Sequence, residues 1–73
     1  MTQSPNIANA KRAARCRAAL TGYNDKYDLV ANLIDLLADA RHWCDAHGRC
    51  FGDLDRIAHE HYLAELAAEG GPS

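Results

Sequence analysis

Residues 28–47 contain the pattern that most constrains this chain, because apolar side chains recur there every three or four positions. That spacing is the period of an amphipathic α-helix. Its apolar face comprises Leu29, Leu33, Leu37, Ala40, Cys44 and His47, widened by Ile34, Leu36 and Trp43. The opposite face is polar and comprises Asp28, Asn32, Asp35, Asp39, His42 and Asp45. Such a helix buries its apolar face against other helices, so we expect the acidic face to be exposed to water.

Two further helices are predicted on either side of this segment. The first spans about residues 5–20, where Ser4–Pro5 is a typical helix start and Gly22 a typical stop. The third spans about residues 51–68 after a stop at Gly48. Its expected buried stripe is Phe51, Leu54, Ile57, Ala58, Tyr62 and Leu66, with Asp53, Arg56, Glu60 and Glu69 facing outward. Short connections predict one all-α domain over residues 1–73, a small up-down-up three-helix bundle with its second helix over residues 28–47.

A chain of 73 residues buries only a thin core. A single core of this size typically supplies about 3–5 kcal/mol of stability. The sequence contains no run of 18 apolar residues, which a membrane-spanning helix would need, and no apolar signal core near Met1. The odd count of three cysteines fits a reducing compartment better than a disulfide scaffold. We therefore expect a cytoplasmic protein.

The charge is distributed unevenly along the chain. Residues 1–24 contain four basic and no acidic residues, a charge of +4, whereas residues 25–73 contain four basic and ten acidic residues, a charge of −6. This asymmetry favours either contact between opposite charges within the fold or a polar partner.

Cysteine and histidine residues near the end of the second helix suggest a zinc site as one alternative. Cys44, His47 and Cys50 are three residues apart, and His59 and His61 follow. Zinc prefers four such ligands, but His59 and His61 lie two apart on a helix and point in different directions. A half-buried cysteine and a histidine that interacts with the helix dipole explain the pattern more simply. We therefore predict no metal site and no cofactor.

Asp35, Asp39 and His42 share one helical face and raise the possibility of proton transfer or divalent-ion binding. No nucleophile, glycine-rich loop or pocket pattern accompanies them. The alternatives are a solvated face or one that meets Arg12 and Arg15. We therefore predict that the protein is not an enzyme.

Nucleic-acid binding is an alternative function, suggested by a basic patch in the first helix. Its residues are Lys11, Arg12, Arg15 and Arg17. Four cations on one helix are suited to phosphate contacts, but no aromatic residue lies between them and the remainder of the chain is acidic. Trp43 is expected to be either a core residue or an interface anchor.

A resemblance to known proteins lies in two neighbouring segments, Asn32–Asp39 and Arg41–Gly48. The pattern continues through Phe51, Leu54, Ala58, His61–Tyr62 and Glu65. Over about residues 18–66 the chain resembles short helical accessory proteins encoded on phages, plasmids and integrated elements of bacteria. The resemblance implies a protein that occupies a surface of a host machine. Anti-CRISPR proteins, which inhibit a host defence system, are one such class. Many of these proteins carry an acidic residue at the position of Cys50, where this chain departs from the pattern.

Together these observations predict a non-enzymatic, cytoplasmic protein that works through protein–protein contact. The expected partner is a host protein or ribonucleoprotein complex, bound by an acidic face made of Asp35, Asp39, His42 and Asp45. The alternative is a small dimeric regulator that contacts nucleic acid through Lys11, Arg12, Arg15 and Arg17. A homodimer is compatible with either function, because thin cores leave apolar surface to be covered.

Overall fold

The computed structural model describes residues 6–24 and 28–70, which form three helices. They are α1 (Asn6–Leu20), α2 (Leu29–Ala46) and α3 (Phe51–Gly70). No strand occurs among these residues, so the predicted all-α, three-helix fold is confirmed. The predicted helix limits differ from the observed ones by at most two residues. The expected cap at Ser4–Pro5 lies outside the described residues.

The ends of α2 follow from local sequence signals. The Asp28 side chain accepts a hydrogen bond of 2.9 Å from the backbone N–H of Val30, as expected for an N-cap. At the other end Gly48 has a φ of 65°, a left-handed conformation that glycine adopts without strain. The N–H groups of Gly48 and Arg49 return to the carbonyls of Asp45 and Cys44. This pattern is a Schellman motif, which satisfies the free carbonyls of the last turn.

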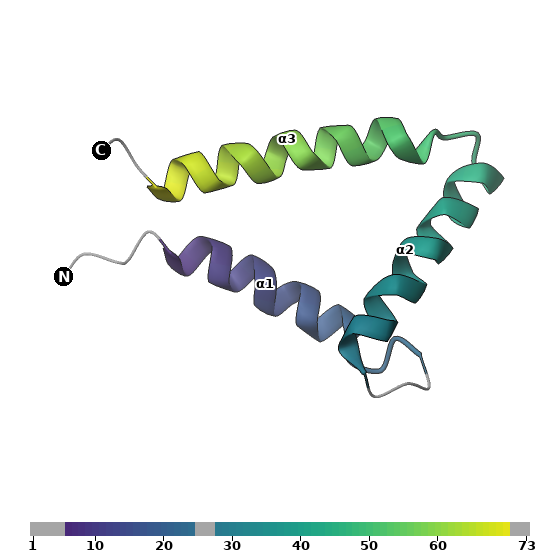
Figure 1. The fold of residues 1–73 in the computed structure, drawn as a ribbon, viewed down its shortest axis with the longest axis horizontal. Helices are drawn as coiled ribbons and strands as arrows, with labels where there is room; N and C mark the ends of the chain where they lie inside the picture. The colour runs from purple at the N-terminus through teal and green to yellow at the C-terminus, as the bar shows by residue number, and fades with distance from the viewer. Residues whose placement is uncertain (1–5, 25–27, 71–73) are drawn as a thin grey trace.

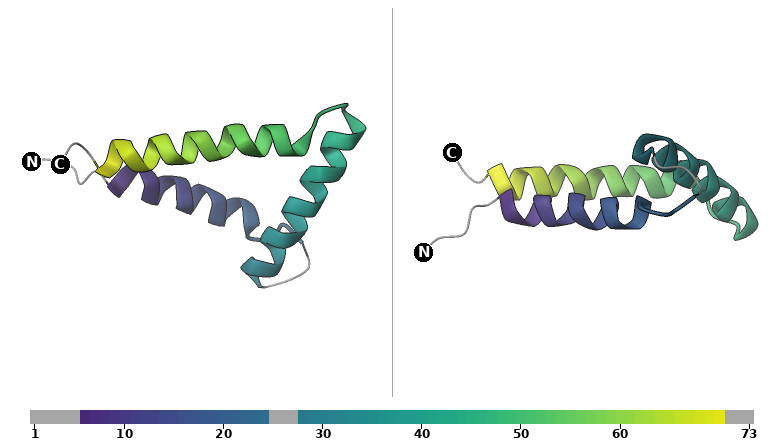
Figure 2. Two further views of the ribbon diagram at one scale, coloured as in Figure 1. Left: turned by 45° about the horizontal axis from the view of Figure 1, so that its top comes forward. Right: turned by 90° about the horizontal axis from the view of Figure 1, so that it is seen from below.

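The three helices form a flat, open triangle (Figure 1). Helix α2 runs across from the end of α1 to the start of α3, while α1 and α3 converge at their other ends (Figure 2). The molecule measures 45 × 30 × 15 Å and has a radius of gyration of 15.2 Å. A compact chain of this length has a radius of gyration of about 11 Å. The helices therefore meet mainly near the corners of the triangle, and burial is limited to those regions.

Asn32 forms the corner between α1 and α2. Its side chain is 0% exposed, and its Nδ2 donates a hydrogen bond of 2.9 Å to the carbonyl oxygen of Leu20, the last residue of α1. Leu20 itself is 6% exposed. The prediction that Asn32 lies on the water-facing side of α2 is therefore wrong. The side chain faces inward, where its amide is a second donor to a carbonyl oxygen at the end of α1 that also accepts from the backbone N–H of Tyr23.

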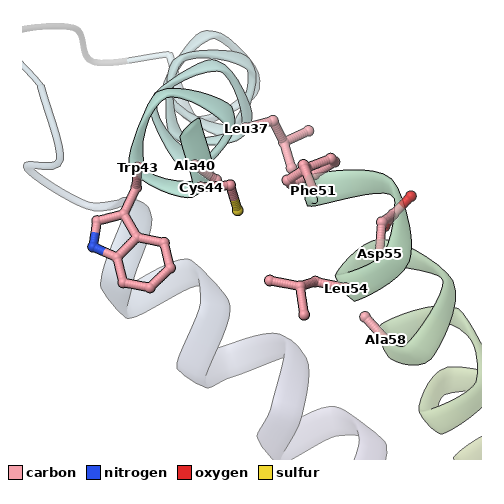
Figure 3. Close-up of a pocket in the computed structure, with 8 residues that line it drawn as sticks. All are labelled: Leu37, Ala40, Trp43, Cys44, Phe51, Leu54, Asp55 and Ala58. Atoms are coloured by element: carbon pink, nitrogen blue, oxygen red, sulfur yellow. The ribbon is translucent and has the colours of Figure 1, made fainter. Parts of the chain in front are cut away.

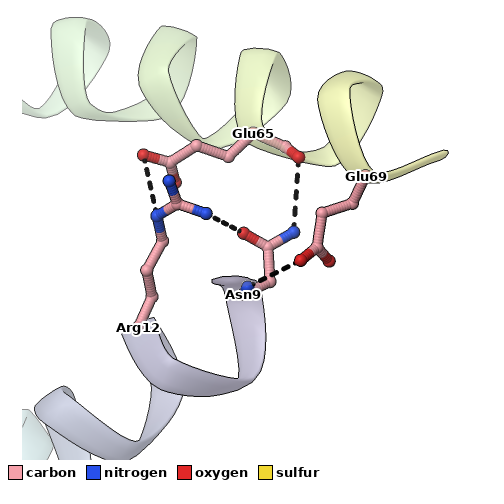
Figure 4. Close-up of polar contacts among 4 residues, drawn as sticks. All are labelled: Asn9, Arg12, Glu65 and Glu69. Carbon is pink, nitrogen blue, oxygen red and sulfur yellow. Dashed lines mark hydrogen bonds and ion pairs between the residues drawn. The ribbon is translucent and has the colours of Figure 1, made fainter. Parts of the chain in front are cut away.

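Polar side chains join α1 to α3 at the converging ends (Figure 4). The Glu69 carboxylate accepts a hydrogen bond of 2.7 Å from the backbone N–H of Asn9, in the first turn of α1. Arg12 Nε lies 3.4 Å from Glu65 Oε2, and Arg12 Nη1 donates to Asn9 Oδ1. Glu69 was expected to face outward. That prediction is wrong, because the positive end of the α1 dipole and its free N–H groups attract a carboxylate supplied by α3.

The corner between α2 and α3 combines Cys44, which is 3% exposed, with a cation–π contact. The Arg41 guanidinium carbon lies 4.1 Å from the centre of the Phe51 ring. Leu20 and Cys44 are the buried apolar residues of the described chain. Much of the apolar stripe predicted to be buried is instead exposed by two fifths or more, including Ile34, Leu37, Trp43, Leu54, Ile57, Tyr62 and Leu66. The open triangle explains this difference, because it leaves these helix faces without a neighbour.

Candidate protein-interaction surfaces

The predicted acidic face lies on α2 and is largely accessible. Asp39, His42 and Asp45 are exposed, and Asp35 is half-buried. Neither Asp39 nor Asp45 belongs to an ion pair within the described residues, where Arg12–Glu65 and Arg56–Glu60 are the pairs formed. The face therefore presents negative charge that no described cation contacts at Asp39 or Asp45.

Two side chains from the segment after α1 orient the carboxylates of this face. Tyr23 donates its hydroxyl to Asp39 Oδ2 at 2.8 Å, and Asn24 Nδ2 donates to Asp35 Oδ2 at 2.7 Å. The hydrogen bond to Asp39, together with desolvation and the negative charges of Asp39 and Asp35, raises the pKa of Tyr23 above its usual value of 10.0. The protonated phenol is favoured because only that form donates a hydrogen bond.

This contact predicts a specific dependence of stability on alkaline pH. Because the folded state raises the pKa of Tyr23, its contribution is fully present below pH 10.0 and is lost as pH rises through the higher folded pKa. We expect the free energy of unfolding to fall over that range, and to fall less in Tyr23→Phe. Urea unfolding at a series of alkaline pH values, with tyrosinate absorbance as the titration signal, measures both effects. Identical pH profiles for the two proteins would contradict the prediction.

The basic residues of α1 are divided between two environments. Lys11, Arg15 and Arg17 are exposed, whereas Arg12 contacts Glu65 of α3. One alternative was that the acidic face of α2 meets Arg12 and Arg15 of the first helix. Arg12 instead contacts Glu65 of α3, and Arg15 is exposed. A phosphate-binding surface in this arrangement rests on the three exposed cations, because the fourth already has a carboxylate beside it.

The cysteine and histidine residues near the end of α2 are not arranged as a zinc site. Cys44 is buried, whereas Cys50 is exposed in the connection to α3. The His47 ring stacks on Trp43 with 4.1 Å between ring centres, and its Nδ1 lies 2.8 Å from the Trp43 carbonyl oxygen. Within residues 6–24 and 28–70, no three His, Cys, Asp or Glu side chains are placed to hold a metal ion.

A second surface, not predicted from the sequence, is an apolar groove between α2 and α3 (Figure 3). We call it the α2–α3 groove; it has a volume of about 440 Å³ and is lined by Leu37, Ala40, Trp43, Cys44, Phe51, Leu54, Asp55 and Ala58. Asp55 is its only charged lining residue. The apolar periodicity identified most of these side chains, but as core residues. Their exposure follows from the angle between the helices, which periodicity does not encode.

Comparison with protein-family profiles, curated proteins and solved structures gives no match. None of the helices in the described part of the chain combines the length and apolar character needed to cross a membrane.

Proposed function

We propose that this chain is a small non-enzymatic protein that binds a basic surface of a host protein or ribonucleoprotein complex through Asp35, Asp39, His42 and Asp45. The observation that carries the proposal is the orientation of the exposed Asp39 carboxylate by a neutral donor, the Tyr23 hydroxyl. Neutral donors fix the position of a carboxylate without cancelling its charge. A positioned negative surface accelerates encounter with a basic partner and selects its orientation.

The resemblance to accessory proteins of bacterial mobile elements narrows this proposal to a host machine in the bacterial cytoplasm. Inhibition of a defence system such as CRISPR–Cas is the narrowest form of it. A protein of this kind acts by occupying a surface, so it needs no catalytic group. The exposed, carboxylate-rich side of α2 supplies such a contact without any further chemistry.

The test compares bait proteins in affinity capture from a bacterial lysate. Asp35→Asn/Asp39→Asn removes two charges but keeps an oxygen acceptor for each donor. Tyr23→Phe removes one donor and keeps both charges, so it separates the orientation of Asp39 from its charge. We expect the native bait to retain a basic partner, the Tyr23→Phe bait to retain the same partner more weakly, and the double variant to lose it. For the purified partner, we expect association with the double variant to be at least about tenfold slower at low salt.

Equal retention by the native and doubly neutralised baits would reject the acidic face. A fourth bait, Lys11→Gln/Arg15→Gln/Arg17→Gln, addresses the nucleic-acid alternative. Retention that nuclease abolishes, and that this bait alone loses, would favour the basic helix instead.

A further inference from the structure

The corner where α1 and α3 converge is held differently from the other two corners of the triangle. Leu20 is buried where α1 meets α2, and Cys44 is buried beside the α2–α3 groove. No described residue at the α1–α3 corner is buried, and the contacts drawn there in Figure 4 are polar. Salt screens interactions between accessible charges but does not weaken apolar burial. The α1–α3 corner is therefore the one that dissolved ions weaken.

Three polar contacts join α1 to α3, and two of them depend on charge. The backbone N–H of Asn9 donates to the Glu69 carboxylate at 2.7 Å, and Asn9 Nδ2 donates to the Glu65 carbonyl oxygen at 3.3 Å. Arg12 Nε lies 3.4 Å from Glu65 Oε2, and these two side chains remain 40% and 36% exposed. An ion pair with that much exposure contributes little to stability, and the attraction of a carboxylate to a helix start is also screened by salt.

The other end of α1 has the features of a hinge. Leu20 is 6% exposed, and its carbonyl oxygen accepts from Asn32 Nδ2, so this end of α1 stays attached to α2. Two residues further on, Gly22 has a φ of 75°, and among the described residues beyond its neighbours no atom lies within 4 Å of the position that a Cβ would take. A turn with open surroundings absorbs changes of dihedral angle without a clash, as hinges do.

We propose that Asn9, Arg12, Glu65 and Glu69 form an electrostatic latch, which holds the triangle closed at low salt and releases α1 from α3 when its charges are screened. Helix α1 then swings about Leu20, and the three helices themselves persist. A swing of about 30° moves the far end of this 15-residue helix, which is about 22 Å long, by about 11 Å. Opening also frees the Arg12 guanidinium from Glu65. The latch uses no residue of the acidic face, so this inference is independent of the proposed host partner.

The distance between two spin labels, measured by double electron–electron resonance, tests the latch in the whole chain. Labels at Ala10→Cys in α1 and Ala67→Cys in α3 occupy exposed positions outside the latch, and Cys16→Ser/Cys50→Ser removes the exposed native thiols. Sodium chloride at about 0.01 M leaves a screening length of about 30 Å, and at about 1 M it leaves about 3 Å. We expect one short distance at the lower concentration and a distance at least about 10 Å longer at the higher one. Far-ultraviolet circular dichroism of the same samples should show that helix is retained.

Two variants of the labelled chain remove one cation and one anion each, at different places. Arg12→Gln/Glu69→Gln breaks the latch, whereas Arg56→Gln/Glu60→Gln removes the exposed ion pair within α3 and serves as the matched control. We expect the first variant to show the long distance already at low salt and the control to keep the short one. The salt series needs neither variant, so it does not depend on how they fold. A distance that stays short at high salt, equal distances in the two variants, or loss of helix as the distance grows would overturn the proposal.

Discussion

Replacing Asn32 with aspartate is expected to unfold the protein at neutral pH. Asn32 is 0% exposed, and its amide donates to the Leu20 carbonyl. A carboxylate at this position cannot donate, and it places a buried charge against a carbonyl oxygen. Leaving a buried charge without a partner costs about 3–5 kcal/mol. That cost equals about the whole stability expected of a core of this size.

Far-ultraviolet circular dichroism at a fixed protein concentration measures this loss of helix. Ala38→Asp is the matched control, because it adds the same charge to α2 at an exposed position. Asn32→Ala removes the donor without adding a charge and should cost about 1–3 kcal/mol. If Asn32→Asp melts together with Ala38→Asp, the corner between α1 and α2 does not depend on this hydrogen bond.

Truncation of Leu20 to alanine should lower the free energy of unfolding by about 2–4 kcal/mol. Leu20 is 6% exposed, and it is the largest apolar side chain buried in the described part of the chain. Its removal takes away transfer free energy and leaves a cavity where the side chain was buried. Urea unfolding of the native chain and Leu20→Ala measures the difference.

Leu66→Ala provides the comparison for Leu20→Ala, because Leu66 lies on α3 and is 45% exposed. An exposed leucine contributes little to stability, so this variant should lose less than about 1 kcal/mol. Equal losses in the two variants would show that the buried corner is no more important for folding than the surface of α3.

The limits of the helices were predictable because their signals are local. Asp28 caps the turn that follows it, and Gly48 adopts the left-handed conformation at the helix end that lies beside it in sequence. Each signal acts within a few residues, so the group that needs a hydrogen-bond partner and the group that provides it lie close together in the sequence.

The contacts of Asn32 and Glu69 were not predictable in the same way. Asparagine and glutamate usually face water, and both were assigned there by their position in the helical period. Their partners, the Leu20 carbonyl and the Asn9 N–H, are separated from them by 12 and 60 residues. Only the relative placement of whole helices brings these groups together, and periodicity carries no information about it.

The candidate surfaces show the same division. The exposure of Asp39, His42 and Asp45 follows from their polar side of α2 and was predicted. The contacts of Tyr23 and Asn24 with Asp39 and Asp35 depend on how the chain turns after Gly22. The α2–α3 groove depends on the crossing of two helices. The exposure of these polar residues was therefore predictable, whereas the contacts that group residues into a surface were not.

The small number of buried apolar side chains has a consequence for how the chain responds to temperature. The heat capacity of unfolding arises mainly from apolar surface that becomes hydrated. A single chain that encloses little more than Leu20 and Cys44 offers little such surface. Its free energy of unfolding should therefore change little with temperature, and its thermal transition should be broad.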